Sequence, residues 1–557
     1  MSIRITPAAA APAARWVGRC MRRGKSKAIA VGLAGLLPLL LAGCDQPEPP
    51  PFTRQRDPNQ IIIGTTAKVT TLDPADAYTV FAGNVLLALG DRLYTYKPGT
   101  TELQPQLATA LPQVSSDGLT YRMPLRRGVV FQDGTPFNAE AMRFSLQRFI
   151  ENGGRPAFLL KNVVADIQAT GDYELTIRLQ KPFAPFPRLL AFSGLCAVSP
   201  QAYRIGAGQF QPRMFVGTGP YQLVSFGSDA LKLKRFPQYW GTPPASAQLD
   251  IQFLSSSANL YNALQTGAVD VAYQFLEPEQ IKKLQAQADI QTVSSDGTGI
   301  NYLSLNRNQP PLDQQAVRQA LALVMPRQLL QERVFQNLVE PAFSLVPSRL
   351  PGYQPVFRVP AEPPPAGRAR ELLSQAGITL TQPVRIDLWY RSNLPSHIQV
   401  VSTLKAVIER EIPVQLIPQP VDSTTAYQNL EKGIYPMFLL DWYPDFLDAD
   451  NYLEPLMSCQ KGTLAEGCLE GSSRTFGSFY YSPQANDLIA QSRRSTDPQQ
   501  RLALLGQLQK LMAVDVPYIP LWQNREFVFA RADVQGVRLE PTQTFPFWLL
   551  KKAVPAP

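Results

Sequence analysis

Strand-like and helix-like segments alternate along the chain from residue 61 onward, which excludes an all-α or an all-β fold. Apolar and polar residues alternate with period 2, as in strands, over 173–179, 231–234 and 384–388. Helices are predicted after an Asn138 cap, over 259–266 before Gly267, and between an Asp313 cap and Pro326. This mixture predicts an α/β or α+β protein.

The N-terminal residues have the layout of a secretory signal. Residues 15–27 hold six Lys or Arg and no acid, an apolar run follows over 28–41, and Leu-Ala-Gly-Cys ends at Cys44. The apolar run is short for a bilayer span, although a short transmembrane helix with an accidental Cys is the alternative. We therefore predict a signal peptide over 1–43, and translation from Met21 would give a more usual one.

The tetrapeptide that ends at Cys44 resembles the bacterial lipobox. The resemblance implies cleavage between Gly43 and Cys44 and lipidation of the Cys44 thiol, so that the protein is anchored to a membrane. Asp45 follows, and Asp at that place resembles a signal that keeps lipoproteins in the inner membrane of some Gram-negative bacteria. Residues 44–58 are rich in Pro and are interpreted as a tether that holds the body off the lipid.

The high net charge belongs mostly to this leader. Residues 1–43 hold seven of the 53 Lys and Arg and none of the 44 Asp and Glu, so 46 basic and 44 acidic residues remain in the mature chain. No basic field is left that would indicate a nucleic-acid partner. The mature chain is long enough for three or four domain-sized units with large cores.

Three cysteines lie in the body of the chain. Cys459 and Cys468 enclose a Gly-containing segment outside the cytoplasm, so a small-loop disulfide is predicted, with two free thiols as the alternative. Cys196 lies in an apolar stretch and is interpreted as a small buried residue.

A series of short strings in the mature chain resembles the oligopeptide/dipeptide-binding family of extracellular solute-binding proteins that serve ABC importers. Single strings are weak, but their order along nearly the whole mature chain is specific. They occur, in this order, at 72–74, 104–108, 116–126, 128–139, 217–221, 263–270, 305–308, 313–320 and 442–445. Turn dipeptides such as Asp133-Gly134 also have a purely structural reading, so most of these strings are expected to determine the fold rather than to contact a ligand.

The resemblance implies a two-lobed α/β fold of the periplasmic-binding-protein type (type II-like, the large three-domain subclass) with a hinge between the lobes. The expected parts are a lobe 1 core (59–97, 214–297 and 526–557), an extra subdomain of lobe 1 (98–213) and lobe 2 (298–525). It also implies a non-enzymatic, cofactor-free monomer on the extracytoplasmic face of the membrane, which captures short peptides and delivers them to importer permease subunits by closing about the hinge.

The segment 441–450, Asp-Trp-Tyr-Pro-Asp-Phe-Leu-Asp-Ala-Asp, is the most unusual in the chain. It follows an apolar strand-like stretch, and loops at strand ends are common ligand sites. In peptide-binding members of the family, the Asp of Trp-x-x-Asp pairs with the ligand's α-ammonium, which the resemblance carries over to Asp445. The alternative is that Asp445 caps a helix or braces the loop. Trp442 and Tyr443 are candidates for a wall of the ligand site, or for core.

Two further candidates lie at the end of the strand over 384–388. Trp389 could face the cleft, and Arg391 could bind a ligand carboxylate, although a solvated loop Arg is the commoner explanation. A calcium loop competes for the acids of 441–450, but their spacing lacks the alternate ligands and central Gly of an EF-hand.

Other functions remain as alternatives. An enzyme such as a secreted hydrolase finds little support, since His397 is the one histidine of the chain and no Gly-x-Ser-x-Gly or zinc-ligand pattern occurs; only paired carboxylates would serve. Within the solute-binding family, the ligand could instead be an oligosaccharide, an opine or a nickel chelate. The lone histidine speaks against a dedicated metal site.

Overall fold

The computed structural model describes residues 57–274, 276–360 and 365–553. The predicted signal over 1–43, the predicted lipidation site Cys44, and Asp45 lie outside the described residues, as does the predicted tether apart from residues 57 and 58. Within the described ranges, no helix combines the length and the apolar character needed to cross a membrane.

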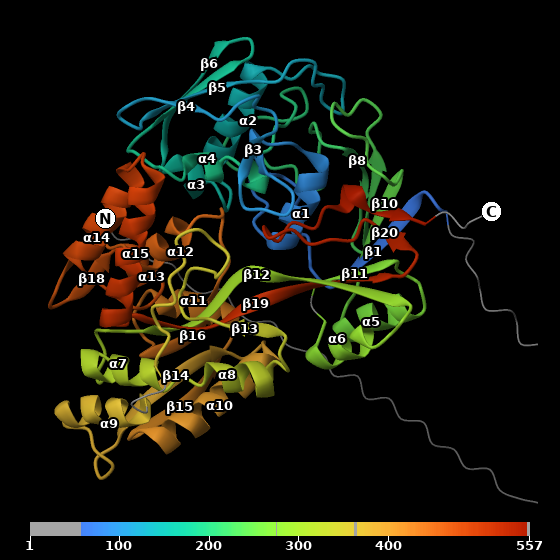
Figure 1. Ribbon diagram of the computed structural model, residues 1–557. Coiled ribbons are helices and arrows are strands. Elements are labelled where there is room, and N and C mark those ends of the chain that lie inside the picture. Colours follow the sequence, from blue (N-terminus) through green and yellow to red (C-terminus); the bar gives the residue numbers. More distant parts are fainter. Residues whose placement is uncertain (1–56, 275, 361–364, 554–557) are drawn as a thin grey trace, which may run out of the picture. The chain divides into compact units, whose positions relative to one another are not determined.

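One 11-stranded sheet runs through the described body (Figure 1). Its strands, in spatial order, are β15 (Val414–Val421), β14 (Val384–Arg391), β16 (Met437–Trp442), β12 (Ile290–Leu305), β19 (Tyr518–Arg531), β11 (Val271–Tyr273), β1 (Gln60–Thr65), β10 (Gln248–Phe253), β9 (Ala230–Arg235) and β8 (Tyr221–Phe226). A further strand, β13 (Val339–Pro341), pairs with β19 off this path.

The two long strands β12 and β19 connect the two halves of the sheet. They pair antiparallel with each other over most of their length, while β16 pairs with the end of β12 and β11 pairs with the end of β19. The register shifts between Asp296 and Ile300, which interrupts the ladder near its middle. The fold is therefore two-lobed, with two chain segments crossing between the lobes. The predicted domain limits at 297/298 and 525/526 fall in this region and stay a prediction.

The parallel strands of both lobes run toward the register shift near the middle of β12 and β19. β16 runs antiparallel to β12 so that Met437 lies opposite Leu305 and Trp442 opposite Ile300. In the other lobe, β11 runs from Ala530 toward Val528 of β19. In open α/β sheets, ligands bind beyond the carboxyl ends of the parallel strands. Both sets of carboxyl ends converge on the same region.

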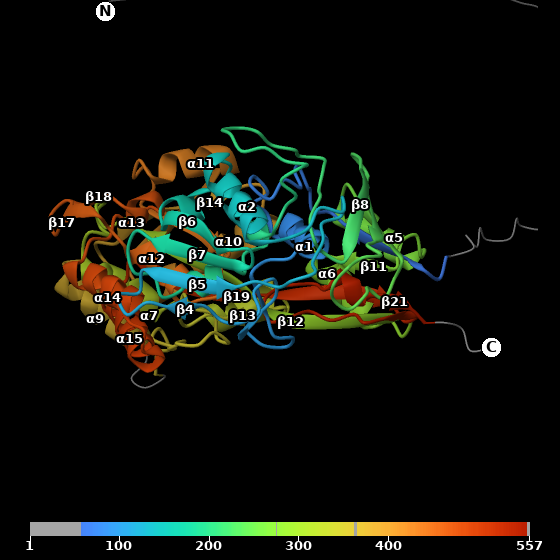
Figure 2. The same ribbon diagram turned by 90° about the horizontal axis from the view of Figure 1, so that it is seen from above.

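Smaller sheets accompany the large one. A four-stranded sheet of β4 (Gln113–Val114), β5 (Thr120–Pro124), β7 (Glu174–Leu179) and β6 (Val164–Gly171) packs with helix α2 (Figure 2). The two-stranded sheets are β2 (Tyr94–Tyr96) with β3 (Leu103–Pro105), β17 (Lys461–Thr463) with β18 (Gly467–Glu470), and β20 (Val534–Gln535) with β21 (Lys551–Lys552).

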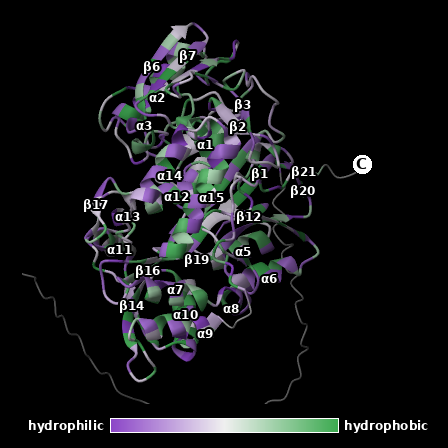
Figure 3. Ribbon diagram, turned by 60° about the vertical axis from the view of Figure 1, so that its left-hand side comes forward, coloured by the Kyte–Doolittle hydropathy of each residue, from purple (hydrophilic) through white to green (hydrophobic). Residues whose placement is uncertain are grey.

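The helices carry both apolar and polar residues (Figure 3), as expected for helices that pack one side against a sheet and expose the other to solvent. They are α1 (Val80–Leu89), α2 (Ala139–Glu151), α3 (Phe158–Lys161), α4 (Phe186–Leu189), α5 (Ser257–Gln265), α6 (Pro278–Gln285), α7 (Gln315–Leu323), α8 (Arg327–Leu329), α9 (Pro365–Gln375), α10 (Pro395–Glu411), α11 (Ser423–Leu430), α12 (Asp450–Met457), α13 (Ser472–Thr475), α14 (Pro483–Arg494) and α15 (Pro498–Asp515), with short helical turns η1 (Ser193–Leu195), η2 (Leu330–Val334) and η3 (Phe547–Leu549).

Local sequence signals succeed where the partner lies nearby. The Asn138 side chain caps α2 by accepting from the Ala141 N–H at 2.9 Å, as predicted. Helix α5 starts at Ser257, two residues before the predicted limit, and Gly267 follows its end with φ +71°. The predicted Asp313 cap is wrong. Helix α7 starts at Gln315, its N-cap position is Gln314, and no side chain caps it.

Candidate functional site

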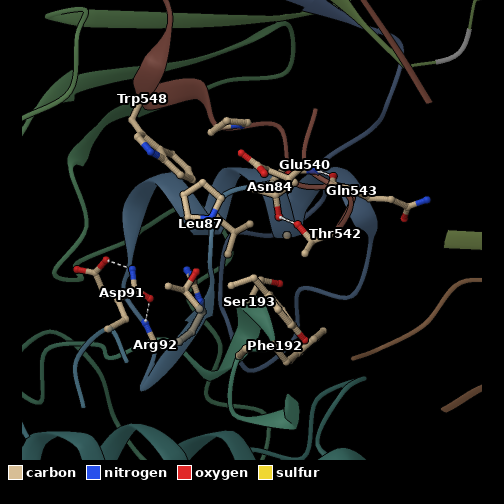
Figure 4. A pocket seen from close by; sticks show the side chains of 18 of the residues that line it. Asn84, Leu87, Asp91, Arg92, Phe192, Ser193, Glu540, Thr542, Gln543 and Trp548 are labelled. Carbon is tan, nitrogen blue, oxygen red and sulfur yellow. Dashed lines mark hydrogen bonds between the residues drawn. The ribbon is translucent and has the colours of Figure 1, made fainter. Parts of the chain in front are cut away.

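A cavity of about 1020 Å³ lies where the carboxyl ends of the sheet converge. Residues of both lobes line the cavity. One lobe contributes the α1 region, the segments around β2–β3, 188–193 and 239–245, and the C-terminal segment 538–551. Thr298 and residues 443–447 line it from the other. Figure 4 shows Asp91 and Arg92 at one side of this cavity and Glu540, Thr542 and Gln543 at another.

Helix α1 fixes the lobe 1 wall. The Thr79 side chain caps it, accepting from the Ala82 N–H at 3.4 Å. Asn84 on this helix is buried, and its side-chain oxygen accepts from the Phe545 N–H at 3.0 Å. This bond ties the C-terminal segment to α1, so residues more than 450 positions apart form one continuous wall.

Asp445 stands three residues beyond the end of β16 and lines the cavity. Pro444 favours extended backbone at Tyr443, and the Asp445 N–H donates to the Asn451 side-chain oxygen at 2.7 Å. The next helix, α12, begins at Asp450 with Ala449 as its N-cap. Asp445 therefore does not cap a helix, and its carboxylate faces the cavity.

Tyr78 of the opposite lobe reaches this carboxylate. Its hydroxyl donates to Asp445 Oδ1 at 2.5 Å. The edges of Phe158 and Phe192 hold the Tyr78 ring, with centroid distances of 6.0 and 6.3 Å. Burial and the adjacent negative charge raise the pKa of Tyr78 well above its usual value, so the phenol keeps its proton and donates.

The other three acids of the segment 441–450 are paired with arginines. Asp441 accepts from Arg391, Asp448 pairs with Arg501 at 2.5 Å, and Asp450 pairs with Arg493 at 2.7 Å. Within the part of the chain that the structure describes, no cationic side chain lies within ion-pair distance of Asp445.

The electrostatics of Asp445 follow from that arrangement. Burial without a cation raises its pKa from 3.8 to about 6, against the opposing effect of the bonds from Tyr78 and Asn451. At neutral pH it is ionised but poorly compensated. Such a carboxylate is suited to bind a cation that enters the cavity.

Tyr443 also lines the cavity and is 38% exposed. Its hydroxyl accepts from the Asn524 side-chain N–H at 2.6 Å. The ring lies against Gly299 of β12, where a Cβ would come within 2.7 Å of the ring. Glycine at this position is therefore needed for the tyrosine to lie over the hinge strand.

The remaining sequence candidates lie apart from the cavity lining. Trp442 packs edge-on against Phe476 at 5.2 Å and is part of the lobe 2 core, the alternative that the sequence had left open. The Trp389 ring packs against Tyr435 in the same core, with centroids 4.8 Å apart and the ring planes tilted by 43°. Arg391 is buried beside Asp441 and donates to the Tyr427 hydroxyl at 3.1 Å, so the solvated-loop alternative is wrong. None of these three side chains is among the described residues that line the cavity.

Several residues of the site escape the sequence reasoning, above all Tyr78, Asn84, Asp91 and Arg92. One signal was available: Asp91-Arg92 is a pair of charges between two apolar stretches, which is unusual inside a core. The others need the tertiary fold.

Elsewhere, the sulfur atoms of Cys459 and Cys468 are bonded to each other, and Cys196 is a buried free thiol, as predicted from its apolar surroundings. His397 is buried, and burial lowers its pKa to about 3, so this imidazole is neutral. No group of His, Cys, Asp and Glu among the described residues is arranged to hold a metal ion.

A two-lobed body with a large cavity between its lobes is the architecture expected of a solute-binding protein. The sequence model of one protein family, the bacterial extracellular solute-binding proteins of family 5, matches residues 102–463. The chain belongs to that family. The chain is thus a substrate-binding protein of an ABC importer and not an enzyme.

Known proteins agree with this assignment. The glutathione-binding protein GsiB of Escherichia coli O1:K1 is 29% identical over 503 residues, which cover 88% of this chain and 93% of that protein. DppA from Helicobacter pylori in complex with the peptide STSA has a TM-score of 0.72 and 22% identity, covering 89% and 98% of the two chains. NikZ from Campylobacter jejuni in complex with Ni(L-His) has a TM-score of 0.71 and 16% identity, covering 89% and 100%. The two solved structures show the fold alone.

Proposed function

We propose that this solute-binding protein captures short peptides with a free α-ammonium group and hands them to an ABC importer. The observation that carries the proposal is the state of Asp445: an ionised carboxylate on the cavity wall without a cation, next to three acids that each have one. A ligand ammonium would complete it by charge-assisted hydrogen bonds.

The cavity suits a ligand of that size. Its volume of about 1020 Å³ lies at the upper end of the usual range of about 300–1000 Å³ for small-molecule sites. A short extended peptide fits with room for water, which accommodates side chains of different kinds. Closure of the lobes about β12 and β19 would bury the peptide and present the closed form to the importer.

Glutathione is the first specific peptide to test. Two relatives that match this chain over about nine-tenths of their own length are named glutathione-binding proteins. Glutathione is a tripeptide with a free amino group, so it meets the requirement that Asp445 sets. The identity of 29% leaves the ligand of this chain to experiment.

Isothermal titration calorimetry tests the proposal. Glutathione, trialanine and tetra-alanine are the peptide ligands, and an oligosaccharide and Ni(L-His) are titrated separately as the alternative ligands. We expect at least one free-amine peptide to bind in a one-to-one ratio and its N-acetylated form to bind at least tenfold more weakly. Binding of only the sugar or the nickel chelate would replace the peptide proposal with one of those ligands.

We also propose that Cys44 carries the lipid anchor of the mature protein, from the basic, apolar and Leu-Ala-Gly-Cys order at the N-terminus. Expression of the full-length chain with Cys44→Ala tests this by membrane fractionation and mass spectrometry of the N-terminal peptide. Loss of a lipid-modified peptide and release from the membrane fraction would support the anchor. An unmodified Cys44 in the unaltered protein would contradict it.

A further inference from the structure

Arg92 is a buried cation on the cavity wall. It follows α1 by three residues and is 4% exposed, yet it lines the cavity beside Asp91 (Figure 4). A buried guanidinium requires an anion or several acceptors to offset the loss of hydration. Its surroundings therefore determine whether it serves the fold or a ligand.

The guanidinium is incompletely satisfied by the protein. Nη1 donates to the Gly90 carbonyl oxygen at 3.2 Å and Nη2 donates to Thr95 Oγ1 at 3.3 Å. The first distance lies at the upper end of the usual N–H···O range and the second just beyond it, and both acceptors are neutral. Nε has no partner, and no carboxylate of the described residues lies within ion-pair distance. Of the five N–H donors of an arginine, most remain available.

The neighbouring carboxylate does not complete Arg92. Asp91 is fully buried, and its oxygens accept from four neutral donors. These donors are Gln106 Nε2 at 2.6 Å, Tyr239 OH at 3.4 Å, Thr218 Oγ1 at 3.1 Å and Trp240 Nε1 at 2.8 Å. Asp91 thus adds a nearby negative charge but no direct bond to Arg92.

Other cations of the cavity wall already have partners. Lys97 pairs with Glu102 at 2.7 Å, Arg188 with Asp448 at 3.4 Å, and Arg538 with Glu540 at 2.7 Å. Lys551 has an exposed side chain, and water can solvate its charge. Among the cations of the cavity wall, Arg92 is therefore both buried and without a direct counter-ion.

We propose that Arg92 binds a carboxylate of the ligand, so that the cavity takes ligands with an ammonium at one end and a carboxylate at the other. This inference rests on the proposed peptide function and adds a second charge requirement to it. The carboxylate is either the C-terminal group of the peptide or that of an acidic side chain. Asp445 and Arg92 together would fix the direction in which the peptide lies.

The test measures binding to Arg92→Met, which keeps the apolar stem of the side chain but removes the charge. Arg92→Lys keeps the charge without the planar fork, and Arg122→Met removes a surface arginine that lies outside the cavity lining. The ligands are trialanine, trialanine amide, glutathione and Ala-Ala-Glu amide, titrated by calorimetry into the full chain. Thermal unfolding of each variant verifies that it is folded.

In the unaltered protein and in Arg122→Met, we expect C-terminal amidation of trialanine to weaken binding about tenfold or more. In Arg92→Met the free acid should bind about tenfold more weakly, and amidation should then change little. Arg92→Lys should fall between. Stronger binding of Ala-Ala-Glu amide than of trialanine amide would place an acidic side chain at Arg92.

Two results would overturn the inference. Equal binding of trialanine and its amide, with Ala-Ala-Glu amide no better, would remove Arg92 from the ligand site while leaving peptide binding intact. An equal effect of amidation in Arg92→Met and in the unaltered protein would show that Arg92 serves Asp91 and the fold alone. If none of the free-amine peptides bound the unaltered protein, the proposed function itself would fail.

Discussion

Asp445→Asn separates a ligand-binding carboxylate from a structural one, because the two roles predict opposite effects on stability. The substitution removes the uncompensated charge but keeps an oxygen that can accept from Tyr78. Loss of charge-assisted bonds to a ligand ammonium, worth about 1.5–3 kcal/mol, weakens binding of a free-amine peptide by roughly 10- to 150-fold.

The same change should stabilise the ligand-free protein. Burial raises the pKa of Asp445 from 3.8 to about 6, and each unit corresponds to about 1.4 kcal/mol, which sets a ceiling of about 3 kcal/mol. The side chain is partly exposed, and solvent screening reduces the expected gain to about 1 kcal/mol. A carboxylate that braces the fold would instead lose stability when neutralised.

The sign of the pH dependence follows from the direction of the shift. The folded protein holds the Asp445 proton more tightly than the unfolded chain, so ionisation destabilises the folded state as pH rises from about 4 to about 6. The stability difference between Asp445→Asn and the unaltered protein should be small at pH 4 and full above pH 7. Peptide affinity should fall about fivefold from pH 6 to pH 5, and about tenfold for each pH unit below that, since the bound form needs the carboxylate ionised.

Urea unfolding and calorimetric titration at pH 4, 5, 6 and 7.5 measure both effects. Asp487→Asn, a change of an exposed acid on α14, is the matched control and should alter neither quantity. A less stable Asp445→Asn protein at pH 7.5, or unchanged affinity for free-amine peptides, would refute the assigned role.

Three further outcomes are expected. Tyr78→Phe removes the hydroxyl that lowers the pKa of the neighbouring carboxylate, so the loss of peptide affinity on acidification, measured by calorimetry, should begin at a higher pH; an unchanged midpoint would contradict this coupling. Arg391→Met leaves Asp441 without its partner and should lower the free energy of unfolding by about 2 kcal/mol, with part recovered in the double variant with Asp441→Asn and peptide affinity unchanged; a selective loss of affinity would restore Arg391 as a ligand residue. Replacing both Cys459 and Cys468 by Ala opens a loop closed across nine positions and should cost about 2.7 kcal/mol in urea unfolding without changing peptide affinity; an equally stable variant would show that the bond contributes nothing.

The sequence predicts those parts of the fold that depend on neighbours along the chain. Asn138 caps α2 because its partner is the N–H three residues on. Asp313 was expected to cap α7 by the same logic, but the helix begins one position later than such a cap requires. A residue type that suits a cap does not determine the first residue of the helix, which here follows the Pro-containing segment before α7.

The site was predictable only in part, because its decisive facts are long-range. The acids of 441–450 look alike in the sequence, and what distinguishes Asp445 is the absence of an arginine such as Arg391 or Arg493, each 43 or more positions from the acid it pairs with. Its place at a strand end makes Arg391 a candidate for a ligand carboxylate or a solvated loop residue, yet the adjacent β16 supplies Asp441 as its partner. Pairing across strands is not visible in a single sequence.

Native mass spectrometry of the purified protein, after incubation with glutathione and short free-amine peptides, tests the central claim most directly. We expect the mass of the protein plus one intact peptide, the same peptide recovered chemically unchanged after denaturation, and loss of the complex in Asp445→Asn. A protein that forms no complex with any free-amine peptide, or that returns the peptide as fragments, would contradict the account.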